Sequence, residues 1–209
     1  MTDAFLGDPL WARPVLSYTL ASFASDGFQQ QVARILSRIA EIAGGPDHLH
    51  LPPLPTLHAS LYGIAPVRSN FDKEAYWQAH GPRALAELVE FCAGQRAFAL
   101  RLRRLRATPT AVIAVAEPEE AVWALRRRMA EALPPPPGGA VRYDLIHVTL
   151  ARYAQPEKLP ADFAMRIAAC TIDLSFPIET IVVMHETVYP SLAYDTVAAQ
   201  SLMTAEFVS

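Results

Sequence analysis

The sequence predicts an α+β fold of two pseudo-symmetric lobes, with antiparallel sheets lining a central cleft and helices packed outside. Segments typical of strands alternate with amphipathic helices in an uneven order. A unit of strand, helix, loop and strand occurs twice, and each copy leads to a strand that carries a histidine, His58 or His147. Apart from one tetraproline the chain has no low-complexity segment. We therefore expect one two-lobed domain over residues 1–209, with an internal duplication.

The first unit begins at Pro14. Residues 14–23, PVLSYTLASF, predict a strand, and Ser25 or Asp26 can cap a helix that begins near Phe28. Apolar side chains of that helix recur on one face, and Gly44-Gly45 provide its end. The proline-rich segment LPPLPT then leads to the first histidine strand, LHASLYG, at residues 57–63.

The second unit repeats this order. Residues 110–118 predict a strand, and residues 119–133 predict a helix with one apolar face. The segment PPPPGG at residues 134–139 ends that helix, because proline cannot continue it. Residues 141–153, VRYDLIHVTLARY, then predict the strand that carries His147.

The remaining segments fill in the two lobes. Residues 71–94 indicate helix with a break at Gly81-Pro82, and residues 97–105 alternate apolar with basic side chains, as in a half-exposed strand. Residues 156–170 predict a helix that Pro160 interrupts. Two further strands are expected at residues 178–188 and 193–202.

Charge and composition exclude several classes of protein. A formal net charge of −3 argues against general affinity for nucleic acid backbones, although a local basic cleft could still hold a phosphate ester or one RNA end. No apolar stretch approaches the ~20 residues of a membrane-spanning helix. The first 14 residues lack the pattern of a secretion signal, and Cys92 and Cys170 lack paired spacing. We expect a soluble cytoplasmic protein with reduced thiols and no obligate protein partner.

The two histidine strands suggest phosphoryl chemistry. Side chains two apart on a strand share a face, so each strand presents an imidazole beside a hydroxyl: His58 with Ser60, and His147 with Thr149. If the lobes pack about a pseudo-twofold axis, the two pairs face each other across a cleft. One neutral imidazole could then take a proton from a nucleophile while the opposite imidazolium donates one to the leaving oxygen. The hydroxyls could bind the non-bridging oxygens, and no metal is required.

A His-x-Ser/Thr tripeptide is weak evidence by itself. It occurs three times among six histidines, the third time at His185–Thr187. Because His185 has no duplicated counterpart, we expect it to be structural or to line the cleft. The repetition of whole units favours a function for His58 and His147.

Other residues near these motifs could contribute. Tyr62 and Tyr153 continue the cleft-facing registers of their strands, where they could bind substrate or simply pack. Arg152 points away in a regular strand, but a bulge would turn it inward toward a phosphate. A basic run, Arg101 to Arg106, is most simply a solvated strand face, and Arg126 to Arg128 is most simply a helix surface.

Three alternatives stay open at this point. A metal site would use His48, His50 and perhaps His58, but no nearby carboxylate or cysteine completes a ligand set, so we expect no metal and no cofactor. A non-catalytic nucleotide or RNA-end binding protein would use the same cleft residues without turnover. In a purely structural domain, both imidazoles would be buried.

The paired motifs resemble those of the 2H phosphoesterase superfamily, closest to its bacterial 2′-5′ RNA ligase and cyclic nucleotide phosphodiesterase branch. HVTLAR at residues 147–152 is similar to the second motif of that family, and HASL at residues 58–61 to the first, with Ser60 where threonine is more frequent. The resemblance implies that His58 and His147 act as general acid and base, with Ser60 and Thr149 binding phosphate. It implies a metal-independent phosphoesterase acting on a 2′,3′-cyclic phosphate of a small nucleotide or RNA end.

Overall fold

The computed structural model describes residues 4–137, 139 and 143–204. Within them, nine strands form one sheet in the order β7-β4-β5-β6-β3-β1-β8-β9, and the short β2 pairs with β6. The pairings between these strands are antiparallel. The strands are β1 (Pro14–Phe23), β2 (Leu49–His50), β3 (His58–Ala65), β4 (Phe98–Ala107), β5 (Ala111–Ala116), β6 (His147–Tyr153), β7 (Thr171–Ile178), β8 (Thr180–Val188) and β9 (Ala193–Ser201).

The sheet has two halves that meet between the histidine strands. β3 and β6 pair through Ala59 and Val148, at the middle of the strand order. Each half has four strands in a corresponding order. From the centre outward these are β3, β1, β8 and β9 in one half, and β6, β5, β4 and β7 in the other. The predicted α+β class with antiparallel pairing is confirmed. The sheets of the two lobes are joined into one through the Ala59–Val148 bridge.

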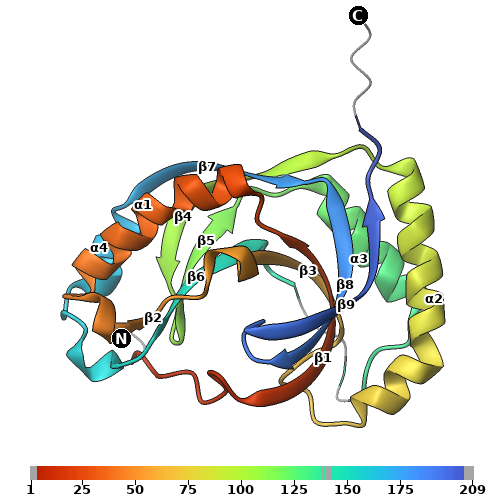
Figure 1. Cartoon of the computed structure of the whole chain (residues 1–209), viewed down its shortest axis with the longest axis horizontal. Coiled ribbons are helices and arrows are strands. Elements are labelled where there is room, and N and C mark those ends of the chain that lie inside the picture. Colours follow the sequence, from red (N-terminus) through yellow and green to blue (C-terminus); the bar gives the residue numbers. More distant parts are fainter. Residues whose placement is uncertain (1–3, 138, 140–142, 205–209) are drawn as a thin grey trace, which may run out of the picture.

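Four helices in the described ranges cover the outer side of this curved sheet (Figure 1). They are α1 (Asp26–Ile42), α2 (Lys73–Gly94), α3 (Glu120–Ala132) and α4 (Phe163–Ala168). α1 and α4 pack on β7 and β4, whereas α2 and α3 pack on β1 and β3. α1 follows β1 but packs on β7, and α3 follows β5 but packs on β3. Each of these two helices therefore packs on the half of the sheet opposite to the strand that precedes it. None of these four helices covers the inner face of the sheet.

The sequence signals for α1 correspond to its observed boundaries. The Ser25 hydroxyl accepts a hydrogen bond from the Phe28 backbone N–H, which caps the first turn. The apolar side chains from Phe28 to Ile42 are buried along one face. Gly44 follows the helix with a φ of 85°, a left-handed conformation that glycine adopts without steric cost.

The helix α2 differs from the expected pair of helices. It is continuous from Lys73 to Gly94 and has Pro82 inside it. Side chains on both sides of Pro82, such as Tyr76 and Leu88, are buried against the core, and this packing keeps the helix in one piece. Gly81 lets the Trp77 ring lie against the backbone, since a Cβ at Gly81 would lie only 2.8 Å from ring carbons. Tertiary packing thus overrides the local breaking signal.

Some strand boundaries also differ from the sequence prediction. β6 begins at His147, and residues 143–146 form no strand. Val141 and Arg142, which the sequence prediction includes in the same strand, lie outside the described residues. The interrupted helix at 156–170 is a short 3₁₀ turn followed by α4. The sequence prediction omits β7, although its exposed and buried residues alternate as in a strand with one solvated face.

No helix in the described ranges has both the length and the apolar character needed to cross a bilayer. The thiols of Cys92 and Cys170 are free, the first buried and the second half-buried.

Candidate active site

The two histidine motifs lie in one cavity of about 270 Å³ on the inner face of the sheet. Ala59 and Val148, the paired residues of β3 and β6, are fully buried on the helix side. Their neighbours along each strand therefore point to the opposite face. We call this space the central cavity; its lining includes His58, Ser60, His147, Thr149, Arg152, Ser17, Glu186, Ser191, Trp11 and Tyr189.

The orientation of His58 is fixed by a backbone contact. Its Nδ1 lies 2.9 Å from the Thr56 carbonyl oxygen. Because a carbonyl can only accept, Nδ1 carries the proton in the neutral ring, which leaves Nε2 free to exchange one. Burial is the main cause that lowers the pKa of His58, and the Arg152 charge lowers it as well, while the Thr56 carbonyl and the Glu186 carboxylate act in the opposite direction.

The surroundings of His147 are more positive. The pKa of His147 is lowered to about 4; burial is the largest cause, and His58, Arg152 and Arg126 contribute in the same direction. In the free protein at pH 7, both imidazoles are therefore neutral, and an anion bound between them would favour their protonation.

A bulge in β6 decides the positions of Arg152 and Tyr153. Against β5, Thr149 pairs with Ile113 and Ala151 pairs with Val112, so Leu150 is an extra residue. Beyond this bulge the alternation of faces is inverted, and Arg152 lines the central cavity.

Tyr153 is consequently not in the cavity, contrary to the period-two prediction. It is 1% exposed, packs edge-on against Phe5 and Phe163, and its hydroxyl lies 2.9 Å from the carbonyl oxygens of Thr108 and Ala111. Its role is packing, the other possibility that the sequence left open.

A matching bulge in β3 moves Tyr62. Against β1, Ser60 pairs with Ala21 and Tyr62 pairs with Leu20, so Leu61 is the extra residue. Tyr62 lines a neighbouring cavity beside Trp123, and Gly63 faces the central cavity in its place. The expectation that Tyr62 faces the cleft is therefore wrong for the same physical reason as for Tyr153.

Arg126 corrects another expectation, since it is buried and not on the helix surface. Its Nε donates to the Leu61 carbonyl at the β3 bulge, and Nη2 donates to the Leu145 carbonyl two residues before His147. The guanidinium lies between the rings of Trp123 and Tyr143, 4.7 and 4.4 Å from their centroids. Arg126 therefore ties together the backbones of the two histidine strands.

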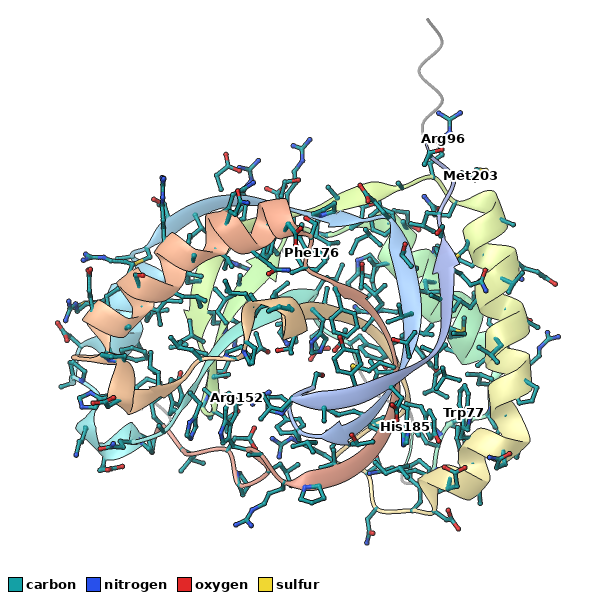
Figure 2. The ribbon with its side chains drawn as sticks, in the orientation of Figure 1. Trp77, Arg96, Arg152, Phe176, His185 and Met203 are labelled. Atoms are coloured by element: carbon teal, nitrogen blue, oxygen red, sulfur yellow. The ribbon has the colours of Figure 1, made fainter. Side chains whose placement is uncertain are left out.

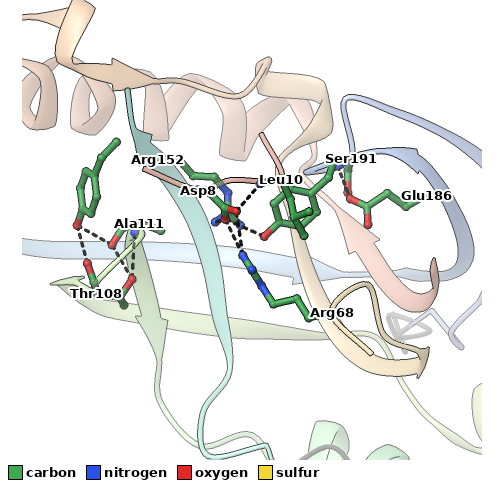
Figure 3. A network of polar contacts seen from close by, with 10 residues as sticks. Asp8, Leu10, Arg68, Thr108, Ala111, Arg152, Glu186 and Ser191 are labelled. Atoms are coloured by element: carbon green, nitrogen blue, oxygen red, sulfur yellow. Dashed lines mark hydrogen bonds and ion pairs between the residues drawn. The ribbon is translucent and has the colours of Figure 1, made fainter. Parts of the chain in front are cut away.

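Asp8 holds Arg152 in place, an interaction that the sequence did not indicate. The Asp8 side chain is fully buried and accepts hydrogen bonds from Arg152, Arg68, the Tyr189 hydroxyl and the Leu10 backbone (Figure 3). The two N–H···O distances from Arg68 are 2.8 and 2.9 Å. Since 144 positions separate Asp8 from Arg152, no local pattern could connect them.

A second buried carboxylate, that of Glu186, borders the central cavity. Its oxygens accept hydrogen bonds from the Ser17 hydroxyl at 2.9 Å and from the backbone N–H and hydroxyl of Ser191. Glu186 directly follows His185 in the sequence, the histidine of the third His-x-Ser/Thr tripeptide.

His185 itself points to the other face of β8. Its ring stacks on Tyr18, which in turn stacks on Trp77 of α2, and Figure 2 places His185 and Trp77 on this side of the fold. Its Nδ1 lies 3.7 Å from the Asp195 carboxylate. Because period two alternates the faces, Glu186 rather than His185 lines the cavity.

The histidines considered for a metal site have other contacts. His48 Nδ1 lies 2.7 Å from the Ala43 carbonyl oxygen, and His50 stacks on Trp11 with 4.4 Å between ring centroids. Within the part of the chain that the structure describes, no group of three or more potential metal-ligating side chains occurs.

The model of the 2′-5′ RNA ligase superfamily matches residues 24–189. The chain belongs to this superfamily. Both bulged histidine strands lie within the matched region, which ends at Tyr189 on the rim of the central cavity. Asp8 lies outside it. No curated protein matches the sequence.

Solved structures share the fold of this superfamily member. One is TT0787 of Thermus thermophilus, with 19% identity, a TM-score of 0.64, and 90% of this chain and 99% of that chain covered. Another is E. coli LigT complexed with phosphate, with 15% identity, a TM-score of 0.57, and 91% and 99% covered. LigT complexed with 3′-AMP has 13% identity, a TM-score of 0.58, and 90% and 99% covered.

Proposed function

We propose that this protein hydrolyses a cyclic phosphodiester, chiefly a 2′,3′-cyclic phosphate on a nucleotide or RNA end, by acid–base catalysis that requires no metal. The observation that carries the proposal is the placement of His58 and His147 in one cavity, each beside a hydroxyl two residues along its strand. The superfamily match and the LigT complexes with phosphate and 3′-AMP are consistent with a nucleotide ligand.

The charges around the two imidazoles favour different roles. Arg152 opposes a proton on both rings, but the Glu186 carboxylate favours one on His58, whereas Arg126 opposes one on His147. We therefore assign His58 as the general acid and His147 as the general base. The oxygen of a water molecule attacks phosphorus and gives its proton to His147. One ribose oxygen leaves phosphorus and receives the proton of His58.

The phosphate oxygens that do not react need donors as charge develops on them. The Ser60 and Thr149 hydroxyls lie on the same strands and the same face as the histidines, and Arg152 lies at the cavity wall. We assign these three side chains to the non-bridging oxygens. Because Asp8 orients Arg152, this guanidinium needs little rearrangement when the substrate binds.

The first test is hydrolysis of the four nucleoside 2′,3′-cyclic monophosphates in excess EDTA, with 2′- and 3′-phosphate products separated by chromatography. We expect turnover that EDTA does not reduce, because the proposed proton transfers use only side chains. Loss of activity in EDTA with recovery on adding one divalent metal would overturn the metal-independent mechanism. Tight binding without any product would favour the non-catalytic binding protein.

The acid–base assignment also predicts the pH dependence of kcat/KM, which reports the free enzyme. The active form has His58 protonated and His147 neutral. The pKa of His147 is lowered to about 4, and that of His58 is lowered from its ordinary value of about 6.5. Activity should fall below about pH 4 as His147 gains a proton, and should fall again as pH rises through the pKa of His58. The expected bell has its maximum on the acid side of pH 6.5, and an optimum above pH 7.5 would contradict the assignment.

A further inference from the structure

A second cavity of about 390 Å³ lies beside the central cavity, on the β5 side of β6. The two share five lining residues: Tyr143, His147, Thr149, Arg152 and Tyr189. We call the second cavity the side groove; beyond the shared residues it is lined by Arg68, Thr108, Thr110, Ala111, Ile113, Asp144 and Leu145. A ligand whose reactive phosphate lies beside His147 can therefore extend into the side groove.

Two guanidiniums are fixed at the junction by one carboxylate. Arg68 comes from the segment after β3 and Arg152 from β6, and Figure 3 shows the Asp8 carboxylate between them. Both hydrogen bonds from Arg68 to Asp8 use Nη2, which leaves its Nε and Nη1 outside this pairing. The Nε of Arg152, a residue that is 8% exposed, has no hydrogen-bond partner in the described part of the chain.

This arrangement leaves positive charge for an anion. Asp8 neutralises one of the two guanidiniums, and its side chain is fully buried. Asp144 also borders the groove, but it is exposed, so that water and salt screen its charge. The Arg68 side chain is 53% exposed and accessible to a ligand. A guanidinium held in this way binds a phosphate with little loss of side-chain entropy.

We propose that the side groove binds a second phosphate of the substrate, the one on the 5′ oxygen of the nucleotide that carries the cyclic phosphate, with Arg68 as its main ligand. This inference rests on the proposed function. A cyclic mononucleotide has one phosphate, which the histidines engage. Arg68 can therefore bind a substrate phosphate only when the substrate is larger. The second phosphate can be the linking diester of an RNA end or the terminal group of a 5′-phosphorylated nucleotide.

The test compares three substrates by kcat/KM: adenosine 2′,3′-cyclic phosphate, its 5′-phosphorylated form, and the dinucleotide ApA ending in a 2′,3′-cyclic phosphate. We expect the two substrates with a second phosphate to be favoured by about tenfold or more, the effect of one charge-assisted hydrogen bond. When both of these substrates exceed the cyclic mononucleotide, a higher value for the dinucleotide points to an RNA end as the source, and a higher value for the 5′-phosphorylated form points to a 5′-phosphorylated nucleotide. Equal values for all three would overturn the proposal.

Variants identify the residue responsible. Arg68→Gln should reduce the preference for a second phosphate by about tenfold, and Arg68→Lys by less, because lysine keeps the charge but loses the planar fork. The matched control is Arg34→Gln on the exposed face of α1, which should leave the preference unchanged. A preference for the dinucleotide without any effect of a 5′-phosphate would assign the groove to the second nucleoside, and would overturn phosphate recognition.

Binding separates this proposal from the proposed function. If none of the three substrates turns over, calorimetry with 3′-AMP and adenosine 3′,5′-bisphosphate measures the same preference without chemistry. Tighter binding of the bisphosphate, lost in Arg68→Gln, would support the side groove even though hydrolysis had failed. Equal affinities of the two ligands would overturn it.

Discussion

Replacement of either His58 or His147 by alanine is expected to lower kcat for a nucleoside 2′,3′-cyclic phosphate by about two to four orders of magnitude. Each change removes one proton transfer, either to the leaving ribose oxygen or from the attacking water. Both imidazoles line the central cavity and are only partly buried, so neither change opens a large void in the core. Steady-state rates of the two variants beside the wild type measure the loss.

The two variants should differ in their pH profiles. His58→Ala should lose the fall in kcat/KM on the alkaline side, and His147→Ala should lose the fall on the acidic side, because each variant lacks the group that titrates there. His80→Ala is the matched control, since this histidine lies on α2 against Tyr76 and lines neither cavity. A loss below tenfold in either variant would contradict two-histidine catalysis, and exchanged profiles would reverse the roles.

Much of the site framework is local enough to predict from the sequence. The positions of β1, α1 and α3 follow from period-two and period-3.6 patterns, and the cap at Ser25 is a local hydrogen bond. The face shared by His58 and Ser60, and by His147 and Thr149, follows from strand geometry alone. These features depend on contacts a few residues apart, so a single sequence carries the information.

Beyond the two bulges, the sequence no longer predicts which face of the strand a side chain occupies. Counting by twos from His58 and His147 fails after Leu61 and Leu150, because each is an extra residue in its pairing with a neighbouring strand. No particular amino-acid type identifies a bulge residue, and both of these residues are leucines. The count failed for Tyr62 and Tyr153 alike.

The residues that tune the site come from distant parts of the chain. Arg126 has the sequence context of a helix surface, inside a basic triplet, yet it satisfies the carbonyl at the Leu61 bulge. Glu186 and Asp8 approach the cavity through β8 and through the segment before β1. No sequence period relates these residues to the histidines, so only the folded sheet reveals them.

The sheet is nearly symmetric, but the charges on it are not. β3 and β6 present equivalent imidazoles and equivalent hydroxyls. Glu186 approaches from the half that holds His58, whereas Arg152 belongs to the strand of His147. Burial and Arg152 lower the pKa of both imidazoles, but only His58 has the compensating charge of Glu186, and the proposed general acid and general base need such a difference.

Asp8→Asn is expected to destabilise the protein by about 3 kcal/mol, near the lower end of the effect of removing one partner from a buried ion pair. Asparagine keeps the shape of the side chain but loses the charge that compensates Arg152, and its amide nitrogen would face guanidinium donors. For a chain of this size the midpoint of thermal unfolding should fall by about 6 to 12 °C. Differential scanning calorimetry of the variant beside the wild type measures both quantities.

The matched control is Asp47→Asn, which removes the same charge from an exposed position before β2. We expect it to shift the midpoint by less than about 2 °C, since exposed substitutions change stability by roughly 0.5 kcal/mol or less. Equal shifts in the two variants would mean that the buried carboxylate does not stabilise the arginine pair. A large shift only in Asp8→Asn, together with weaker binding of phosphate, would identify Asp8 as the residue that couples the segment before β1 to the geometry of the site.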